Sequence, residues 1–225
     1  MSTAAHTSVV RGPGTSTAFT NETCNKITAN TVYEIATDVR RLLDPAVPPV
    51  VQVDADGPGA GAFVTASPST YVVDYLFGRI TFLADLGAVA TVRISGSYLP
   101  ALDLAGVTEW SYTASRTVLD DTTVNNASGT RTKKLGLKDV TGSLSLLELS
   151  TYDHDPGAGA LVLQTAIDAG TPLLIEIAAG GKRFRTWVLL ESKETSAGVD
   201  DLFKTSLNFT GAAQVNGGAG YSWET

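Results

Sequence analysis

The two histidines of this sequence are its best candidates for acid–base chemistry, and neither has the partners that catalysis needs. Hydrolases of the Ser-His-Asp type require an imidazole that a carboxylate orients beside an activated hydroxyl. His6 lies among small residues, and no nucleophile-elbow motif accompanies either histidine. His154 stands between Asp153 and Asp155, but adjacent loop residues supply only one or two of the three or four ligands of a rigid metal site. We therefore expect no catalytic residue and no bound metal.

Two glycine-rich segments and one acid pair are the remaining candidates for chemistry. A phosphate cradle needs a strand, the full glycine pattern and then a helix N-terminus. Residues 56–62 lead into another β run, and residues 155–160 lack the last glycine and a lysine, so we predict connecting turns and no cofactor. Asp120 and Asp121 could be half of a glycosidase pair. Adjacent strand residues face opposite ways, however, so we favour a strand end or a turn.

The charge of the chain restricts its partners. Of its 225 residues only 17% are charged, and the formal net charge is −7, whereas a typical domain has about 25% charged residues. Tight binding to nucleic acid needs clustered lysine and arginine, so this class is excluded. The small basic clusters at 133–138 and 182–185 favour charge-complementary contacts between subunits. The residues that we predict at such contacts are Asp120, Asp121, Lys133, Lys134, Lys182, Arg183, Arg185, Tyr221 and Trp223.

Cysteine usage and hydropathy indicate where the protein is made. Cys24 is the single cysteine, which excludes an intramolecular disulfide framework. Residues 2–10 lack the basic start and the apolar run of a secretion signal. The long uncharged stretches at 57–73 and 205–223 are rich in Gly, Ser and Thr, so neither is expected to span a bilayer. We predict a soluble protein that is made in a cytoplasm and has no membrane partner.

Short runs of Val, Ile, Thr, Tyr and Phe, bounded by Gly, Pro, Asp or Asn, predict a mainly β protein. The expected strands are residues 50–53, 71–75, 79–82, 91–98, 108–118, 141–150, 173–178, 184–192 and 202–209. Broken alternation near Leu146-Leu147 indicates a bulge. A short helical pattern at 37–43 stops before Pro45. Residues 159–169 are predicted to be the one real helix, which ends at Gly170.

Composition divides the chain into four parts. Residues 1–18 are small and polar, so we expect a flexible N-terminal arm. Residues 19–105 are predicted to form a small β module, and residues 106–215 the main β unit. Residues 216–225 form a C-terminal arm, and both arms either order on assembly or stay disordered.

Several motifs follow one another from Gly106 to Gly211. A Gly-Val-Thr-Glu-Trp-Ser segment at 106–111 precedes an Asp-Thr-Thr turn at 121–123. Gly-Leu-Lys-Asp-Val-Thr-Gly-Ser-Leu follows at 136–144, then the predicted helix, then Ser-Leu-Asn-Phe-Thr-Gly at 206–211. This order resembles the major tail tube proteins of long-tailed, siphovirus-like bacteriophages. The resemblance covers about half the chain, and Val140 replaces the aromatic residue that is common after the Asp of the third motif.

The resemblance implies a β-sandwich core with one flanking α-helix and strands that join a ring-shaped β-barrel. Hexameric rings would stack into a tail tube in the virion and contact tape-measure, terminator and baseplate or tip proteins. DNA would pass through the lumen during ejection. The alternating polar residues that we assign to the lumen are Ser111, Thr113, Ser115, Lys204, Ser206 and Asn208. The module at 19–105 resembles small β modules of phage structural proteins, which lie outside a tube or between its rings.

Two other functions stay open at the level of the sequence. The chain could be another phage structural protein, such as a capsid decoration or tail-completion subunit. It could also be a carbohydrate-binding β-sandwich with Trp110, Trp187 or Trp223 as a stacking platform. Trp110 and Trp187 have apolar neighbours in predicted strands, which favours burial in a core. An enzyme is not expected.

Overall fold

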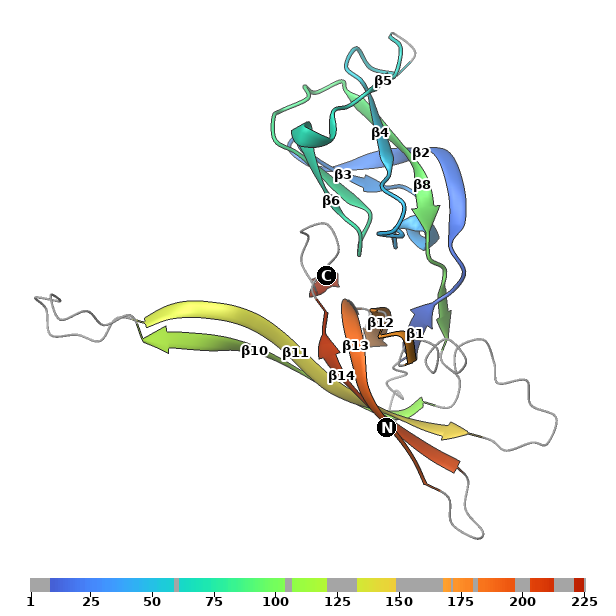
Figure 1. The fold of residues 1–225 in the computed structure, drawn as a ribbon. Helices are drawn as coiled ribbons and strands as arrows, with labels where there is room; N and C mark the ends of the chain where they lie inside the picture. The colour runs from blue at the N-terminus through green and yellow to red at the C-terminus, as the bar shows by residue number, and fades with distance from the viewer. Residues whose placement is uncertain are drawn as a thin grey trace, which may run out of the picture.

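The protein is mainly β and contains two curled sheets (Figure 1). This confirms the fold class that the short β-branched runs predict. The computed structural model describes residues 9–58, 61–103, 107–120, 133–148, 168–170, 172–179, 182–196, 203–212 and 221–224.

Within the described residues the larger sheet has eight strands in the order β10-β11-β14-β13-β12-β1-β9, with β15 paired to β13. Its strands are β1 (Val9–Pro13), β9 (Ala101–Asp103), β10 (Val107–Asp120), β11 (Lys133–Glu148), β12 (Leu173–Ala179), β13 (Lys182–Ser196), β14 (Phe203–Gly211) and β15 (Tyr221–Glu224). The long strand β13 pairs with β12 and β15 along its first half and with β14 along its second half. It therefore connects the two halves of the sheet.

The smaller sheet, which we call the module, has seven described strands in the order β5-β4-β8-β2-β3-β7-β6. They are β2 (Thr17–Thr28), β3 (Val32–Ile35), β4 (Val50–Asp54), β5 (Val64–Thr65), β6 (Tyr71–Asp74), β7 (Arg79–Phe82) and β8 (Thr91–Tyr98). Two single 3-10 turns, η1 (Asp38–Arg40) and η2 (Pro68–Thr70), lie between strands. The expected strands at 71–75 and 79–82 are confirmed as β6 and β7, which pair as a hairpin.

The module is an insertion between two neighbouring strands of the larger sheet. The chain leaves that sheet after β1 and returns to it at β9, and these two strands pair with each other, with Arg11 opposite Asp103. The Gly14 N–H donates to the Pro100 carbonyl at 2.6 Å, where the outgoing and returning chains meet. Part of the expected N-terminal arm therefore lies in a strand. β1 bonds through its backbone to β12 on one side and β9 on the other, and such pairing needs no large side chains.

The core of the module is built from large apolar and aromatic side chains of six of its strands. Its buried members include Phe19, Tyr33, Ile35, Val51, Ile80, Phe82, Val92 and Ile94. Cys24 lies in the same core, where burial and then the charge of Glu22 raise the pKa of its thiol to about 12. Because the thiolate is the reactive form of cysteine, labelling of Cys24 reports opening of the module.

The larger sheet curls so that one of its faces encloses an apolar core. Tyr112 of β10 stacks on Phe184 of β13 with ring centroids 4.5 Å apart. Two strands, β11 and β14, separate β10 from β13 in the sheet order, so a flat sheet would hold β10 and β13 about 14 Å apart. The enclosed core comprises Val140, Leu144, Ile175, Ile177, Phe184, Val188, Leu207 and Phe209.

Some local predictions were wrong or fall elsewhere. Residues 37–43 form only the 3-10 turn η1, because Leu42 and Leu43 use their backbone to bond Leu99 and to bridge Tyr98 at the end of β8. The bulge expected in β11 is in the neighbouring strand, where Thr108 is the extra residue between Val107 and Glu109. β11 itself runs in even register against β14 at this point.

The predicted helix at 159–169 lies almost entirely outside the described residues. Only Asp168 and Ala169 at its end are described, and both are helical. Gly170 follows with a φ of +60°, the conformation of a glycine that ends a helix.

Gly142 is the position in β11 where a side chain has no space. It lies opposite Tyr112 on one side and Phe209 on the other. A Cβ built on Gly142 would overlap the Phe209 ring and the Ser111 carbonyl oxygen. The Phe209 ring thus occupies the space above this glycine within the enclosed core.

We predict that Gly142→Ala destabilises the protein by about 1–3 kcal/mol, the usual cost of overpacking a well-packed core. Gly211→Ala is the matched control, since its nearest neighbour, Val140, is 3.3 Å from the new Cβ and needs only a small displacement. Urea unfolding followed by circular dichroism measures both values. An equal effect of the two substitutions would contradict the tight packing at Gly142.

Candidate functional site

A row of small polar side chains crosses four strands of the larger sheet. Ser111 of β10 lies opposite Ser143 of β11, which lies opposite Asn208 of β14, which in turn lies opposite Ser192 of β13. The Ser111 and Ser143 hydroxyls are hydrogen-bonded at 2.9 Å, and the Asn208 amide donates to the Ser192 hydroxyl at 3.0 Å. Directly opposed residues share a face in antiparallel sheets, so these four side chains form one continuous row.

Neighbouring rows extend this surface on both sides. Glu109, Ser145, Ser206 and Glu194 form one row, and Thr113, Thr141 and Thr210 begin another. Ser115 lies opposite Asp139 further along. We call the thirteen residues the polar face, and all are exposed or half-buried: Glu109, Ser111, Thr113, Ser115, Asp139, Thr141, Ser143, Ser145, Ser192, Glu194, Ser206, Asn208 and Thr210.

Five of the six residues assigned to a common surface from the sequence therefore lie on the polar face. The sixth, Lys204, lies two residues before Ser206 in β14, where it is opposite Leu147 of β11 and Ser196 of β13. The sequence reasoning missed the contribution of β11, although Thr141, Ser143 and Ser145 alternate in the sequence. The predicted bulge near Leu146-Leu147 obscures this alternation, so the sequence alone does not match the polar residues of the strand to those of its neighbours.

The polar face borders a long unpaired edge. Among the described residues β10 pairs with β11 alone, and the last pair between β11 and β14 is Thr141 with Thr210. Beyond that point β10 and β11 continue as a two-stranded ribbon that projects away from the other strands (Figure 1). A two-stranded ribbon is at best marginally stable by itself in water, and an open edge presents unsatisfied backbone groups. Both features suit contact with another strand.

On its other half, the same sheet face is covered by the module. The contact, which we call the junction, has an apolar part formed by Leu42, Leu76 and Phe77 of the module together with Leu174, Trp187 and Ala212 of the larger sheet. All six are buried. Trp187 is consequently not an exposed platform for a sugar, and Trp110 is half-buried and stacks on Tyr112.

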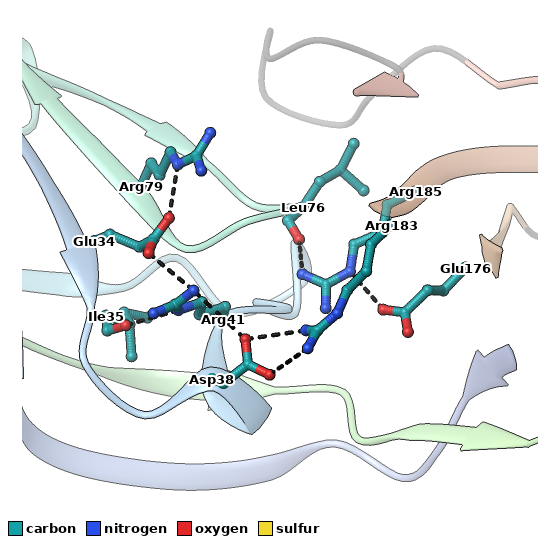
Figure 2. A network of polar contacts seen from close by, with 9 residues as sticks. All are labelled: Glu34, Ile35, Asp38, Arg41, Leu76, Arg79, Glu176, Arg183 and Arg185. Carbon is teal, nitrogen blue, oxygen red and sulfur yellow. Dashed lines mark hydrogen bonds and ion pairs between the residues drawn. The ribbon is translucent and has the colours of Figure 1, made fainter. Parts of the chain in front are cut away.

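Arg185 of β13 carries a charge into this junction. It is only 3% exposed, and its Nε donates to Glu176 of β12 at 2.7 Å. A second nitrogen donates to the Leu76 carbonyl of the module at 2.6 Å (Figure 2). The guanidinium also lies 5.0 Å from the Phe77 ring centroid. Since a buried charge is tolerated only when it is paired and hydrogen-bonded, Arg185 needs contacts from both sheets.

Arg183 starts a second set of ion pairs at the margin of the junction. Its two terminal nitrogens reach the two carboxylate oxygens of Asp38 at 3.0 and 2.8 Å. Arg41 lies between Asp38 and Glu34, 3.5 and 2.9 Å away, and Arg79 also bonds Glu34, at 2.7 Å (Figure 2). The hydrogen bond from Arg183 holds the pKa of Asp38 below its ordinary value.

Arg185, which the sequence places among the candidates for subunit contacts, is buried, and its three contacts lie within its own chain. Arg183 likewise pairs within the chain, with Asp38. Sequence reasoning placed both in a basic cluster and had no signal for the module residues that meet them.

The other described residues that are predicted at subunit contacts lie at or near the ends of strands. Asp120 and Lys133 are opposite each other in the β10–β11 ribbon, and Lys134 is opposite Leu119. Lys182 begins β13 opposite Ala179. Tyr221 and Trp223 belong to β15, which pairs with β13, so part of the expected C-terminal arm is also in a strand. Asp121 lies outside the described residues, as do His6 and the 153–155 segment.

No family model matches the chain, and no curated protein has a significantly similar sequence. In the described ranges, no group of three or more His, Cys, Asp and Glu side chains is arranged to hold a metal ion. Among the same residues no helix is both long and apolar enough to cross a membrane.

We predict that Arg185→Met destabilises the protein by about 3–5 kcal/mol, because the buried Glu176 carboxylate then loses the guanidinium that neutralises it. The double substitution Arg185→Met with Glu176→Leu should be less harmful than the single one, since no charge then stays buried. Arg79→Met is the control: Arg79 is one-third exposed, and Glu34 keeps its pair with Arg41. Urea unfolding measures stability, and a double variant as unstable as the single one would contradict this role for Arg185.

We predict that the Asp38–Arg183 pair stabilises the fold near neutral pH and not in acid. The pKa of Asp38 is lowered in the folded protein, so this stabilisation is present above the ordinary value of 3.8 and is lost as the pH falls through the folded pKa. Asp38→Asn should cost about 1 kcal/mol or less at neutral pH, because Asp38 is partly exposed. The loss of stability caused by Asp38→Asn should become smaller in acid. In a protein that already carries Arg183→Met, the loss caused by Asp38→Asn should be smaller at every pH.

Proposed function

We propose that this protein is a self-assembling structural subunit of the virion, the tail tube protein of a long-tailed bacteriophage. In this proposal its core is a β-sandwich with one flanking helix. Hexameric rings close by strand pairing and stack into the channel through which DNA leaves. The observation that carries the proposal is the polar face, which is a continuous surface of small hydroxyl and amide side chains across four long strands.

A channel for DNA should be smooth, wettable and free of strong anchors. The polar face meets these needs, because its side chains are mostly Ser, Thr and Asn, and some of them satisfy one another. Its three charged members, Glu109, Asp139 and Glu194, are acidic. Acidic groups repel phosphates, so DNA would slide along this surface. Lys204 is the one basic residue assigned to the same lining.

Ring closure would also account for the unpaired β10 edge. A neighbouring copy that adds a strand to β10 would satisfy its free backbone groups and extend the polar face from one subunit to the next. The projecting β10–β11 ribbon would reach over a neighbour. The module covers the other half of this sheet face, so only the uncovered half would line the channel.

We predict that the purified protein forms rings or tubes at high concentration, visible by negative-stain electron microscopy. Thr113→Pro and Ala114→Pro test the edge. Backbone N–H groups of adjacent strand residues point to opposite sides, so one proline removes a bond to β11 and the other removes a donor from the free edge. The variant that keeps the thermal unfolding of the single subunit should fail to assemble.

A charge substitution provides the control for this experiment. Ser143→Lys changes the polar face without touching the edge, so rings should still form. Assembly of the well-folded proline variant would contradict edge pairing. A chain that stays monomeric at every concentration, and above all one that binds glycans, would contradict the tail tube proposal.

A further inference from the structure

An acidic side chain in the module is buried without a counter-charge. Asp54, the last residue of β4, is 1% exposed, and its Oδ2 has no hydrogen-bond partner. Its Oδ1 accepts only the N–H of Asp56, at 3.2 Å. The arginine on the same sheet face, Arg93, is held instead by Gln52 at 2.7 Å and by the Phe63 ring. Buried charges are normally paired or bound to a metal ion, so Asp54 lacks a partner.

A second unsatisfied oxygen lies beside it. Thr91, the first residue of β8, is directly opposite Asp54 in the β4–β8 pair. The Thr91 Oγ1 is buried and also has no hydrogen-bond partner. Side chains at directly opposed positions have Cβ atoms about 5 Å apart. A bound species that contacts both the Asp54 and the Thr91 oxygen would satisfy two buried acceptors at once.

The turn after β4 brings the carboxylate of Asp56 close to that of Asp54. A Cβ built on Gly61 would lie 2.8 Å from Asp54 Oδ1 and 2.9 Å from Asp56 Oδ2. Carboxylate oxygens of two residues therefore approach one point beside Gly61, and a side chain at residue 61 would displace them. Gly57, the residue after Asp56, has a φ of +95°, a conformation that favours glycine.

We propose that this cluster is a calcium site, formed by the carboxylates of Asp54 and Asp56 and the hydroxyl of Thr91. Calcium takes oxygen ligands at about 2.3–2.6 Å, and the Asp54 and Asp56 carboxylates lie close enough together to share one ion. Main-chain carbonyls and water complete the shell. The bound ion neutralises the buried Asp54 charge and ties the turn after β4 to the start of β8.

The ligand set favours calcium over other metals. It contains oxygen only, without the imidazole or thiolate that zinc and copper prefer. Magnesium demands near-ideal octahedral geometry and gives up its water reluctantly, whereas calcium accepts irregular sites with six to eight ligands. An irregular turn that supplies two carboxylates and one hydroxyl fits calcium better.

Thermal unfolding of the full chain in CaCl₂, MgCl₂ or EGTA tests the site, with Cys24 labelling as a second readout of the module. Calcium at about 100 times its dissociation constant should raise the unfolding midpoint by about 5–10 °C and slow the labelling of Cys24. Isothermal titration with CaCl₂ should give one site per chain. Magnesium at the same concentration should give a smaller shift.

Three substitutions and one control locate the effect. Asp54→Asn and Asp56→Asn should abolish the calcium shift, and in EGTA Asp54→Asn should unfold no earlier than the original protein, because it removes an uncompensated charge. Gly61→Ala keeps both carboxylates but fills the space between them, and it too should lose the shift. Asp85→Asn changes an exposed acid of the same module and should retain it.

Other results would overturn the proposal. An unchanged midpoint in calcium and EGTA, or no heat of binding, excludes the site. A calcium shift that survives in Asp54→Asn and Gly61→Ala places the ion elsewhere. Equal shifts with magnesium and calcium overturn the assignment of the metal.

Discussion

The contact between Arg185 and its three partners is the constraint on which the arrangement of the two sheets depends. A guanidinium that is 3% exposed is stable only if its charge and its donors are matched. Glu176, across the β12–β13 pair, supplies the charge, and the Leu76 carbonyl and the Phe77 ring of the module supply the rest. The larger sheet alone leaves Arg185 partly unsatisfied. The module therefore has one favourable position against the larger sheet, and the apolar cluster that includes Leu174 and Trp187 packs around this contact.

The junction divides one face of the larger sheet into two surfaces with different properties. Arg183, Arg185, Trp187 and Leu189 of β13 face the module, whereas Ser192 and Glu194 further along the strand belong to the polar face. The register shift between Leu190 and Ser192 makes this possible. Before the shift the odd-numbered residues of β13 face this side of the sheet, and after it the even-numbered residues do. The bulge lets one strand serve the junction and then the polar face.

The sequence predicted well those strands whose own side chains fill a core. Residues 91–98 match β8, and 71–75 with 79–82 match the β6–β7 hairpin, because alternating β-branched residues specify such strands locally. β1, β2 and β9 were missed, since backbone pairing with distant strands stabilises their small or polar residues. Backbone pairing with a distant strand also explains why residues 37–43 do not form the helix that their pattern predicts. The alternation at 111–115 and 204–208 predicts about half of the polar face. Its β11 residues are recognised only from the strand register, which places them between β10 and β14.

The sequence by itself determined the β composition, the amphipathic alternation of the longest strands and the acidity of the chain, because these depend on residue type and local spacing. Tertiary structure alone decided that the module is an insertion between β1 and β9, and that Arg185 is buried. It also decided that Asp54 lies opposite Thr91 and that its carboxylate lies close to that of Asp56. Each of these involves residues that are neighbours only through strand pairing or the packing of sheets. Which distant backbone closes a pair depends on the free energy of the whole fold, and no local pattern records it.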